Sequence, residues 1–197
     1  MINFKLILFF VCASLNLNAQ TYPFQDVNLM EDERIKNLIS LMTLDKKITC
    51  LSTRIALPRL GVKGTRTIEG LHGLAYSGPA NWAVKGPKAS PTTTFPQAYG
   101  LAQMWDTELM EKIADWQATE ARFIAQNNRF GTGGLVVFAP NADMGRDIRW
   151  GRTEECFGED PFLNGALVTS FVRGLQGNDP AYWKTASLMK HFLANSN

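Results

Sequence analysis

Residues 139–161 contain the densest group of side chains that could do chemistry. The run follows an apolar segment, residues 134–138, whose composition predicts a buried strand. It carries a tryptophan, several carboxylates and three arginines, Arg146, Arg149 and Arg152. A guanidinium presents a planar fork of hydrogen-bond donors, and an indole offers a flat apolar face. The run therefore predicts a loop that binds a polyol with an apolar ring face. A structural ion-pair network is the alternative.

Helices and strands that alternate along the chain must position this loop. The spacing of apolar residues predicts helices over residues 31–41, 43–48, 97–103, 106–126 and 164–175. A short strand with its following loop is predicted over residues 68–75, and further strands over 135–139 and 187–192. Residues 77–94 are rich in glycine and proline and predict a long irregular loop. This alternation predicts βα units and an α/β fold with a parallel sheet.

Polar residues near the ends of the predicted strands are candidate substrate contacts. They are Glu69, Arg152, Lys190 and His191. In a barrel of parallel strands, functional groups gather at the carboxyl ends of the strands. Lys190 and His191 are adjacent, so in a regular strand they would point to opposite faces. We therefore expect the strand to end or bulge at this point.

Other polar and aromatic residues are predicted to be structural. The ring of His72 is expected to donate to the backbone in a tight turn, and Arg146 and Arg149 to hold their own loop. For Trp105 and Trp150, stacking on a sugar and packing in the core both remain open. The carboxylates available to Arg146 and Arg149 are Asp143, Asp147, Glu155 and Glu159.

Four short motifs follow one another along the chain. Residues 69–73 read Glu-Gly-Leu-His-Gly, and residues 93–97 read Thr-Thr-Phe-Pro-Gln. Residues 146–161 run from Arg-Asp-Ile-Arg-Trp-Gly-Arg to Phe-Gly-Glu-Asp-Pro, and residues 190–192 read Lys-His-Phe. The set, in this order, resembles glycoside hydrolase family 3, the β-glucosidase and β-xylosidase family. Ile148 stands where the family usually has proline.

The resemblance implies that residues 21–197 form the N-terminal part of a (β/α)₈ TIM barrel, about its first three βα units. Because a full barrel needs about 250 residues, we expect an incomplete barrel, truncated at its C-terminus. Such a fragment needs the missing part of the barrel and a second domain. Retaining hydrolysis requires a nucleophile and a general acid, two carboxyl groups about 5 Å apart. The family places both beyond the Lys-His-Phe motif, so no catalytic residue is assigned to this chain.

The function that the resemblance implies is an exported, exo-acting, retaining β-glycosidase. It would hydrolyse terminal non-reducing β-D-glucosyl residues of a β-linked oligosaccharide or glycoside, gripped by Glu69, Arg152, Lys190 and His191. β-Xylosidase is the alternative within the family, because glutamate at position 69 is typical of xylosidase-type members. A non-catalytic sugar-binding remnant is the alternative of another class. No cofactor is implied.

The first residues and the overall charge bear on location and partners. Residues 1–20 predict a secretory signal peptide, with a lysine, an apolar stretch and Ala19 at a small-residue cleavage site. We therefore expect the protein to be secreted or periplasmic, with no membrane span after cleavage. The net charge of +2 and the absence of basic runs argue against a nucleic-acid partner.

Cysteine and histidine usage adds little chemistry. Cys50 and Cys156 remain after signal cleavage, and the sequence alone does not place their Cα atoms within bonding range. Two free thiols are favoured. His72 and His191 lack a second ligand at metal-binding spacing, so no metal site is expected.

We predict that the isolated 197-residue chain does not hydrolyse aryl β-glycosides, because it is expected to lack the catalytic pair. Release of nitrophenol from β-D-glucosides and β-D-xylosides measures this. His191→Ala serves as the control, and turnover above that variant would contradict the prediction.

Overall fold

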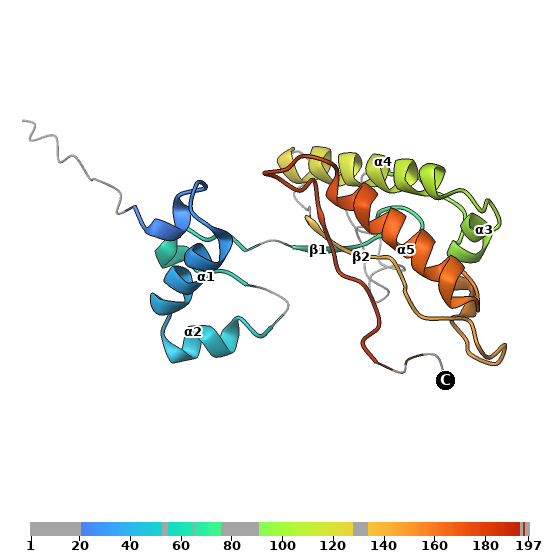
Figure 1. Ribbon diagram of the computed structural model, residues 1–197, viewed down its shortest axis with the longest axis horizontal. Helices are drawn as coiled ribbons and strands as arrows, with labels where there is room; N and C mark the ends of the chain where they lie inside the picture. Colours follow the sequence, from blue (N-terminus) through green and yellow to red (C-terminus); the bar gives the residue numbers. More distant parts are fainter. Residues whose placement is uncertain are drawn as a thin grey trace, which may run out of the picture. The chain divides into compact units, whose positions relative to one another are not determined.

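The computed structural model describes residues 21–52, 55–64, 66–75, 91–127, 134–193 and 195. The chain divides into two compact units, Met1–Thr49 and Cys50–Asn197 (Figure 1). The predicted signal peptide and most of the predicted 77–94 loop lie outside the described residues. Among the helices that are described, none is long and apolar enough to cross a bilayer.

The first unit contains the 3₁₀ helix η1 (Pro23–Gln25), α1 (Glu31–Ser40) and α2 (Leu44–Thr49). Both predicted helices are confirmed. Acidic residues fill the first turn of α1, where the helix dipole favours negative charge. The turn at η1 is anchored on α1, because Arg34 Nε donates to the Phe24 carbonyl at 2.9 Å and Phe24 N–H donates to Asn37 Oδ1 at 3.2 Å.

The second unit is an α/β structure. Its elements are η2 (Pro58–Leu60), β1 (Thr67–Glu69), α3 (Ala98–Ala102), α4 (Thr107–Gln126), β2 (Val136–Phe138), η5 (Thr153–Glu155), α5 (Pro161–Gln176) and β3 (Ala186–Ser187). The strands form a parallel sheet in the order β1-β2-β3. The predicted alternation and the parallel sheet are confirmed. The third strand is shorter than predicted: β3 ends at Ser187, and the strand predicted over 187–192 is wrong in its extent.

Aspartates start the two long helices. Asp106 Oδ1 accepts a hydrogen bond from Leu109 N–H at 2.9 Å, and Asp160 Oδ1 accepts one from Leu163 N–H at 2.7 Å. Each bond satisfies a donor that a helix N-terminus leaves unpaired. The helix predicted over residues 106–126 is confirmed. The start of α5 lies earlier than predicted, since Asp160 caps it and Pro161 occupies its first position, where proline is favoured.

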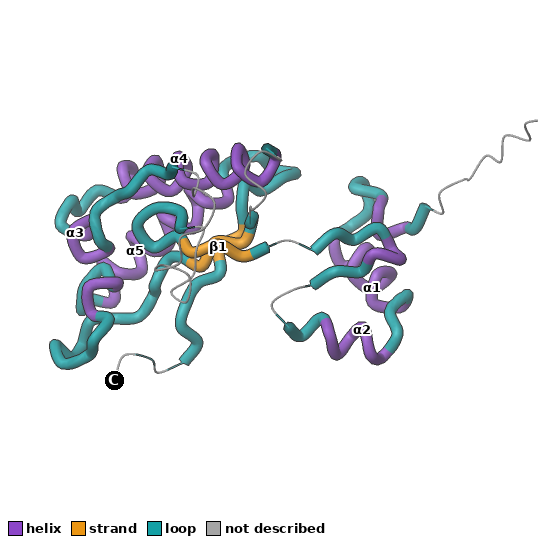
Figure 2. The backbone as a smooth tube through the Cα atoms, turned by 180° about the vertical axis from the view of Figure 1, so that it is seen from behind, coloured by secondary structure: helices purple, strands orange, loops and turns teal. Residues whose placement is uncertain are grey.

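Helices α4 and α5 lie side by side on one face of the sheet (Figures 1 and 2). Helix α4 lies between β1 and β2 in the sequence, and α5 lies between β2 and β3. Sequential strand order with both helices on the same face is the winding of (β/α) barrels. A doubly wound sheet instead reverses its order and carries helices on both faces.

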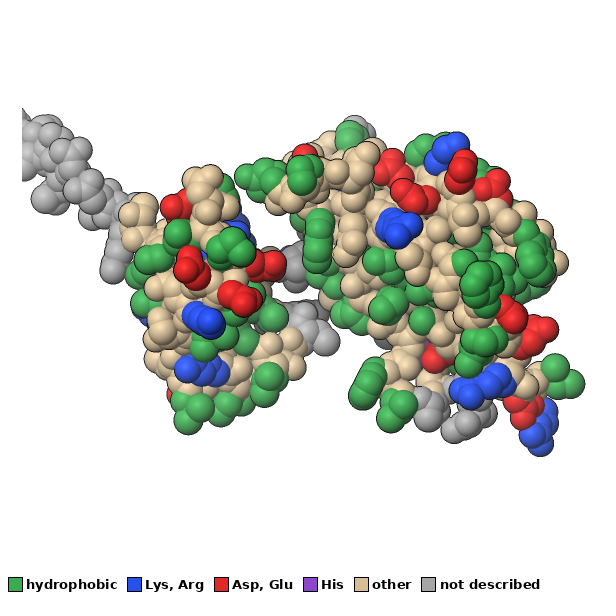
Figure 3. All heavy atoms as spheres, viewed as in Figure 1, with side chains coloured by type: hydrophobic (Ala, Val, Ile, Leu, Met, Phe, Trp, Pro, Cys, Tyr) green, Lys and Arg blue, Asp and Glu red, His purple; other side chains and the backbone are tan. Residues whose placement is uncertain are grey.

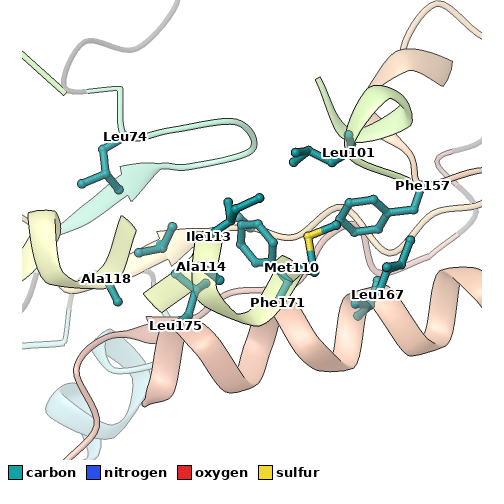
Figure 4. Close-up of a cluster of buried hydrophobic side chains, with 14 of the residues drawn as sticks. Leu74, Leu101, Met110, Ile113, Ala114, Ala118, Phe157, Leu167, Phe171 and Leu175 are labelled. Carbon is teal, nitrogen blue, oxygen red and sulfur yellow. The ribbon is translucent and has the colours of Figure 1, made fainter. Parts of the chain in front are cut away.

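The core lies between this helix layer and the sheet (Figure 4). Ile68 and Val137, the middle residues of β1 and β2, are buried in it, and the rings of Phe157 and Phe171 lie 6.5 Å apart beside Met110. Because strand side chains alternate, the residues flanking Ile68 and Val137 point to the opposite face of the sheet. That face carries the last residues of β1 and β2, Glu69 and Phe138.

The helix layer depends on one close approach. A Cβ atom on Gly174 of α5 would lie 2.2 Å from the Glu111 carbonyl oxygen and 2.7 Å from Ala114 Cβ, both on α4. No side chain fits there without moving one helix away from the other. Gly165 of the same helix is exposed and has no neighbour within 4 Å of such an atom.

Gly174→Ala is therefore expected to destabilise the fold by about 1–3 kcal/mol, the usual cost of overpacking a tight core. Gly165→Ala is the matched control and should be neutral or stabilising by up to about 1 kcal/mol, since alanine favours the helix. Urea denaturation of the wild type and both variants measures the free energy of unfolding. A Gly174→Ala variant as stable as the wild type would contradict the close approach.

Candidate functional site

A pocket of about 850 Å³ lies at the carboxyl ends of the strands. Glu69 ends β1, Phe138 ends β2, and the two residues are aligned in the parallel register. Both line the pocket, as do residues after β3 and in the loop that follows β2. The pocket thus occupies the end of the sheet where α/β folds place functional groups.

The four predicted substrate contacts all line this pocket. Glu69 comes from β1, Arg152 directly precedes η5, and Lys190 and His191 follow β3. Lys190 forms an isolated parallel bridge with Asn141 beyond the end of the strand, and the Lys190–His191 peptide bond is cis. The expectation that the strand ends before these residues is confirmed. Their role as sugar contacts stays a prediction.

Carboxylates hold both cations of the pocket. Lys190 Nζ lies 3.1 Å from Glu69 Oε2, and the lysine side chain is only 13 % exposed. Arg152 forms a bidentate pair with Glu155, with Nε 2.8 Å from Oε1 and Nη2 2.5 Å from Oε2. Paired geometry of this kind fixes the plane of a guanidinium. Glu155 therefore orients Arg152. From the sequence, Glu155 was a candidate partner of Arg146 or Arg149 instead.

The Arg152–Glu155 pair shifts the pKa of both partners. Burial raises the pKa of Glu155, but the hydrogen bond and charge of Arg152, together with the charge of Lys190, outweigh burial and hold this pKa below its usual value. The hydrogen bond that Arg152 donates to Glu155 raises the pKa of Arg152. Both groups are charged at neutral pH, so Arg152 enters the pocket as a fixed donor.

Asp143 is a site residue that sequence reasoning missed. Its Oδ2 lies 2.8 Å from His191 Nδ1, and Arg152 Nη1 lies 3.1 Å from Nε2 of the same ring. The sequence suggested Asp143 only as a partner for Arg146 or Arg149. Its position shortly after the carboxyl end of β2 was the available signal, because strand ends collect functional groups.

Helix α4 holds the pocket wall formed by residues 92–97. The backbone and hydroxyl of Thr93 bond to the Glu120 carboxylate, with Oγ1 2.5 Å from Oε1. Phe95 N–H donates to the His72 carbonyl at 2.8 Å. This segment brings Thr94 and Gln97 to the pocket. Buried Gln117, also on α4, donates to the Gly70 carbonyl at 2.6 Å and holds the wall that follows β1.

The histidine, tryptophan and arginine residues that were predicted to be structural differ in where they lie. His72 lines the pocket, and among the described residues no hydrogen bond of its ring to the backbone is found. Trp150 is buried, which agrees with the core alternative; Trp105 is 74 % exposed, and neither tryptophan lines the pocket. Arg149 pairs with Asp147 at 2.6 Å on the surface, as predicted.

The cysteines are free, and the described residues hold no candidate metal cluster. Cys156 is buried and Cys50 is partly buried, with no disulfide between them. Within the described ranges, no three histidine, cysteine, aspartate or glutamate side chains are placed to hold a metal ion. The pocket offers hydrogen-bond donors and acceptors around a partly apolar wall.

Comparisons with known proteins agree with this description. The N-terminal domain of glycosyl hydrolase family 3 matches residues 83–197. A xylan 1,4-beta-xylosidase of Xylanibacter ruminicola is 35% identical over 94% of this chain and 21% of its own length. Probable beta-D-xylosidase 7 of Arabidopsis thaliana is 36% identical over 93% of this chain and 24% of its own length.

Solved structures of enzymes from the same family resemble the fold. A family 3 exo-beta-xylosidase in complex with a xylobiose aziridine probe has a TM-score of 0.67 and 30% identity, over 86% of this chain and 22% of that one. Beta-glucosidase 3B from Thermotoga neapolitana, in complex with glucose, has a TM-score of 0.56 and 29% identity, over 73% of this chain and 18% of that one.

A parallel α/β sheet with a pocket of charged and apolar side chains at the carboxyl ends of its strands is the arrangement of an α/β enzyme. The chain belongs to glycosyl hydrolase family 3. This confirms the resemblance carried by the four motifs. The chain spans about a fifth to a quarter of the length of the curated relatives that it matches.

We predict that Cys156 resists alkylation in the folded protein. Burial, reinforced by the charges of Asp143 and Glu155, raises the pKa of Cys156 from 9.0 to about 11. At pH 8 this lowers the fraction of reactive thiolate about 100-fold. Mass spectrometry after treatment with iodoacetamide should find Cys156 unmodified in the native protein and modified in urea. Equal rates in both states would contradict the prediction.

Proposed function

We propose that the protein is an exported, exo-acting, retaining β-glycosidase, and that this segment binds the terminal sugar of its substrate. One observation carries the proposal. Glu69, Arg152 and the adjacent pair Lys190 and His191 come from three separate segments of the chain and converge on one pocket at the carboxyl end of a parallel sheet. Export rests on the signal peptide predicted over residues 1–20.

The pocket has the hydrogen-bonding character that a neutral sugar requires. Lys190 and Arg152 are donors, and the Glu69 carboxylate is an acceptor. Hydrogen bonds to charged groups are roughly twice as strong as neutral ones. A sugar hydroxyl that contacts both side chains can accept from Lys190 and donate to Glu69. Each partner then keeps one bond to the ligand.

Apolar side chains complete the site. Leu71, Leu74, Phe138 and Leu188 line the pocket together with the charged residues. The axial hydrogens of a pyranose ring form an apolar face that packs on such side chains. A wall that is partly charged and partly apolar favours a sugar over a fully polar or a fully apolar ligand.

The pocket is proposed to be one part of the active site of a (β/α)₈ barrel. The barrel-type winding supports this, as do apolar side chains that remain exposed on the second unit (Figure 3). Among the most exposed are Phe192, Ile148, Phe162 and Leu193. Further barrel segments would cover such surface. They would also carry the nucleophile, and a second domain the general acid, as the family resemblance implies.

A xylosyl residue is the first candidate for the terminal sugar. The curated relatives reported above are named as xylosidases. The glutamate at position 69 fits the same choice, since its length fills space that the hydroxymethyl group of glucose would need. A glucosyl residue, which the sequence slightly favoured, is the second candidate; the likeness to a beta-glucosidase solved with glucose supports it.

Shortening Glu69 should shift the preference toward glucose. We expect Glu69→Asp in the protein from the complete native reading frame to lower the ratio of kcat/KM for nitrophenyl β-D-xyloside over β-D-glucoside about tenfold, the effect of one methylene in a pocket. Glu159→Asp is the matched control, because Glu159 is exposed in the 139–161 loop and lies outside the pocket lining.

The outcomes of this experiment separate two claims. An unchanged ratio in Glu69→Asp would contradict the steric role of Glu69. A wild-type protein that hydrolyses neither glycoside would contradict the proposed function.

A further inference from the structure

Two charged residues contact the ring of His191 from opposite sides. Asp143 Oδ2 lies 2.8 Å from Nδ1, and Arg152 Nη1 lies 3.1 Å from Nε2. The Asp143 side chain is only 9 % exposed, whereas the His191 side chain is 26 % exposed and lines the pocket. The aspartate therefore lies behind the histidine and outside the pocket lining.

The chemistry of the two neighbours determines the state of the ring. An ionised carboxylate only accepts hydrogen bonds, and a guanidinium only donates them. Nδ1 must therefore carry the proton, and Nε2 must present a lone pair to Arg152. Only the neutral Nδ1–H tautomer satisfies both contacts. The alternative tautomer would turn a lone pair toward Asp143 and an N–H toward the donor of Arg152.

The backbone supports this arrangement. Asp143 N–H donates to Asn141 Oδ1 at 2.8 Å, and Ala142 N–H donates to the Lys190 carbonyl at 2.8 Å. The bond from Ala142 continues the parallel pairing beyond the strands, so the register of the sheet brings Asp143 and His191 together. The contact does not depend on a flexible surface loop.

Two further contacts, made by Arg152 and by the His191 ring, bear on this tautomer. Glu155 holds Nε and Nη2 of Arg152, which leaves Nη1 for the histidine. The Asn195 amide nitrogen Nδ2 lies 3.1 Å from Nδ1. Both atoms are donors in this tautomer, so the tautomer requires the amide to be turned, with its oxygen facing Nδ1–H.

We propose that Asp143 is a positioning residue that fixes the acceptor nitrogen of His191 for a hydroxyl of the bound sugar. A hydroxyl has one donor and two lone pairs. It can donate to His191 Nε2 while its oxygen accepts from Arg152 Nη1, and so it replaces one protein–protein bond with two bonds to the ligand. This inference rests on the proposed function, because it assigns the hydrogen-bond polarity of the same pocket.

The tautomer itself is measured without a ligand. Nitrogen-15 NMR of the complete native protein, labelled at histidine, distinguishes a protonated from an unprotonated ring nitrogen. The His191 signals are those missing from the spectrum of His191→Gln. The expected spectrum at neutral pH has a protonated Nδ1 and an unprotonated Nε2. A protonated Nε2 would overturn the proposal.

The effect on sugar binding is measured with Asp143 variants. Xylose and glucose serve as competitive inhibitors of nitrophenyl glycoside hydrolysis. Asp143→Ala should raise the inhibition constant of the preferred sugar about tenfold, the loss of affinity expected for a hydrogen bond to a charged group. Asp143→Asn keeps an oxygen that accepts from Nδ1–H, so it should retain the tautomer and most of the affinity.

A matched control separates positioning from folding. Asp147→Asn changes an aspartate of the same loop that pairs with Arg149 on the surface, and it should leave sugar affinity unchanged. If Asp143→Ala proves unstable, Asp143→Asn still decides, because loss of the Nδ1–H signal in that variant would overturn the proposal. An Asp143→Ala protein that folds and binds sugar as tightly as Asp147→Asn would also overturn it.

Failure of the proposed function looks different. Wild-type protein that neither hydrolyses the glycosides nor binds the sugars would overturn the function and, with it, the hydroxyl contact. The tautomer signal of His191 would then still report whether Asp143 and Arg152 fix the ring.

Discussion

The parallel register of the sheet is the constraint on which the pocket depends. It aligns Glu69 with Phe138 at the ends of β1 and β2, and it continues past β3 as the bridge between Asn141 and Lys190. Buried backbone donors and acceptors must be paired, and a shift in register would leave several of them unpaired. Because the pocket residues lie within a few positions of these pairs, the same register brings their side chains together.

The helix layer stabilises the sheet and also positions the pocket wall. Helix α4 contributes Met110 and Ile113 to the core, while its polar side chains, Gln117 and Glu120, bond to backbone groups of the wall. Asn164 of α5 donates to the Ala142 carbonyl at 3.0 Å, next to Asp143. Core packing and site geometry are therefore coupled, since a displaced helix would move the carbonyl and amide groups that line or support the pocket.

The charges of the site are arranged in pairs. Lys190 with Glu69 and Arg152 with Glu155 are each matched, and the tautomer proposed for His191 satisfies both Asp143 and Arg152. A pocket of paired charges presents strong donors and acceptors without a large excess of either sign. This is the electrostatic character that suits an uncharged polyhydroxylated ligand, because each hydroxyl both donates and accepts.

The sequence by itself determined the local features: the long helices, the parallel α/β class, and the four motif residues at the strand ends. These follow from periodicity, capping and strand-end position, which are properties of neighbouring residues. Tertiary structure alone decided the pairing of Arg152 with Glu155, the contact of Asp143 with His191, the approach of α5 to α4 at Gly174, and the early end of β3. Asp143 and His191 are separated by 48 positions in the chain, and only the register between β2 and β3 brings them within a hydrogen bond of each other.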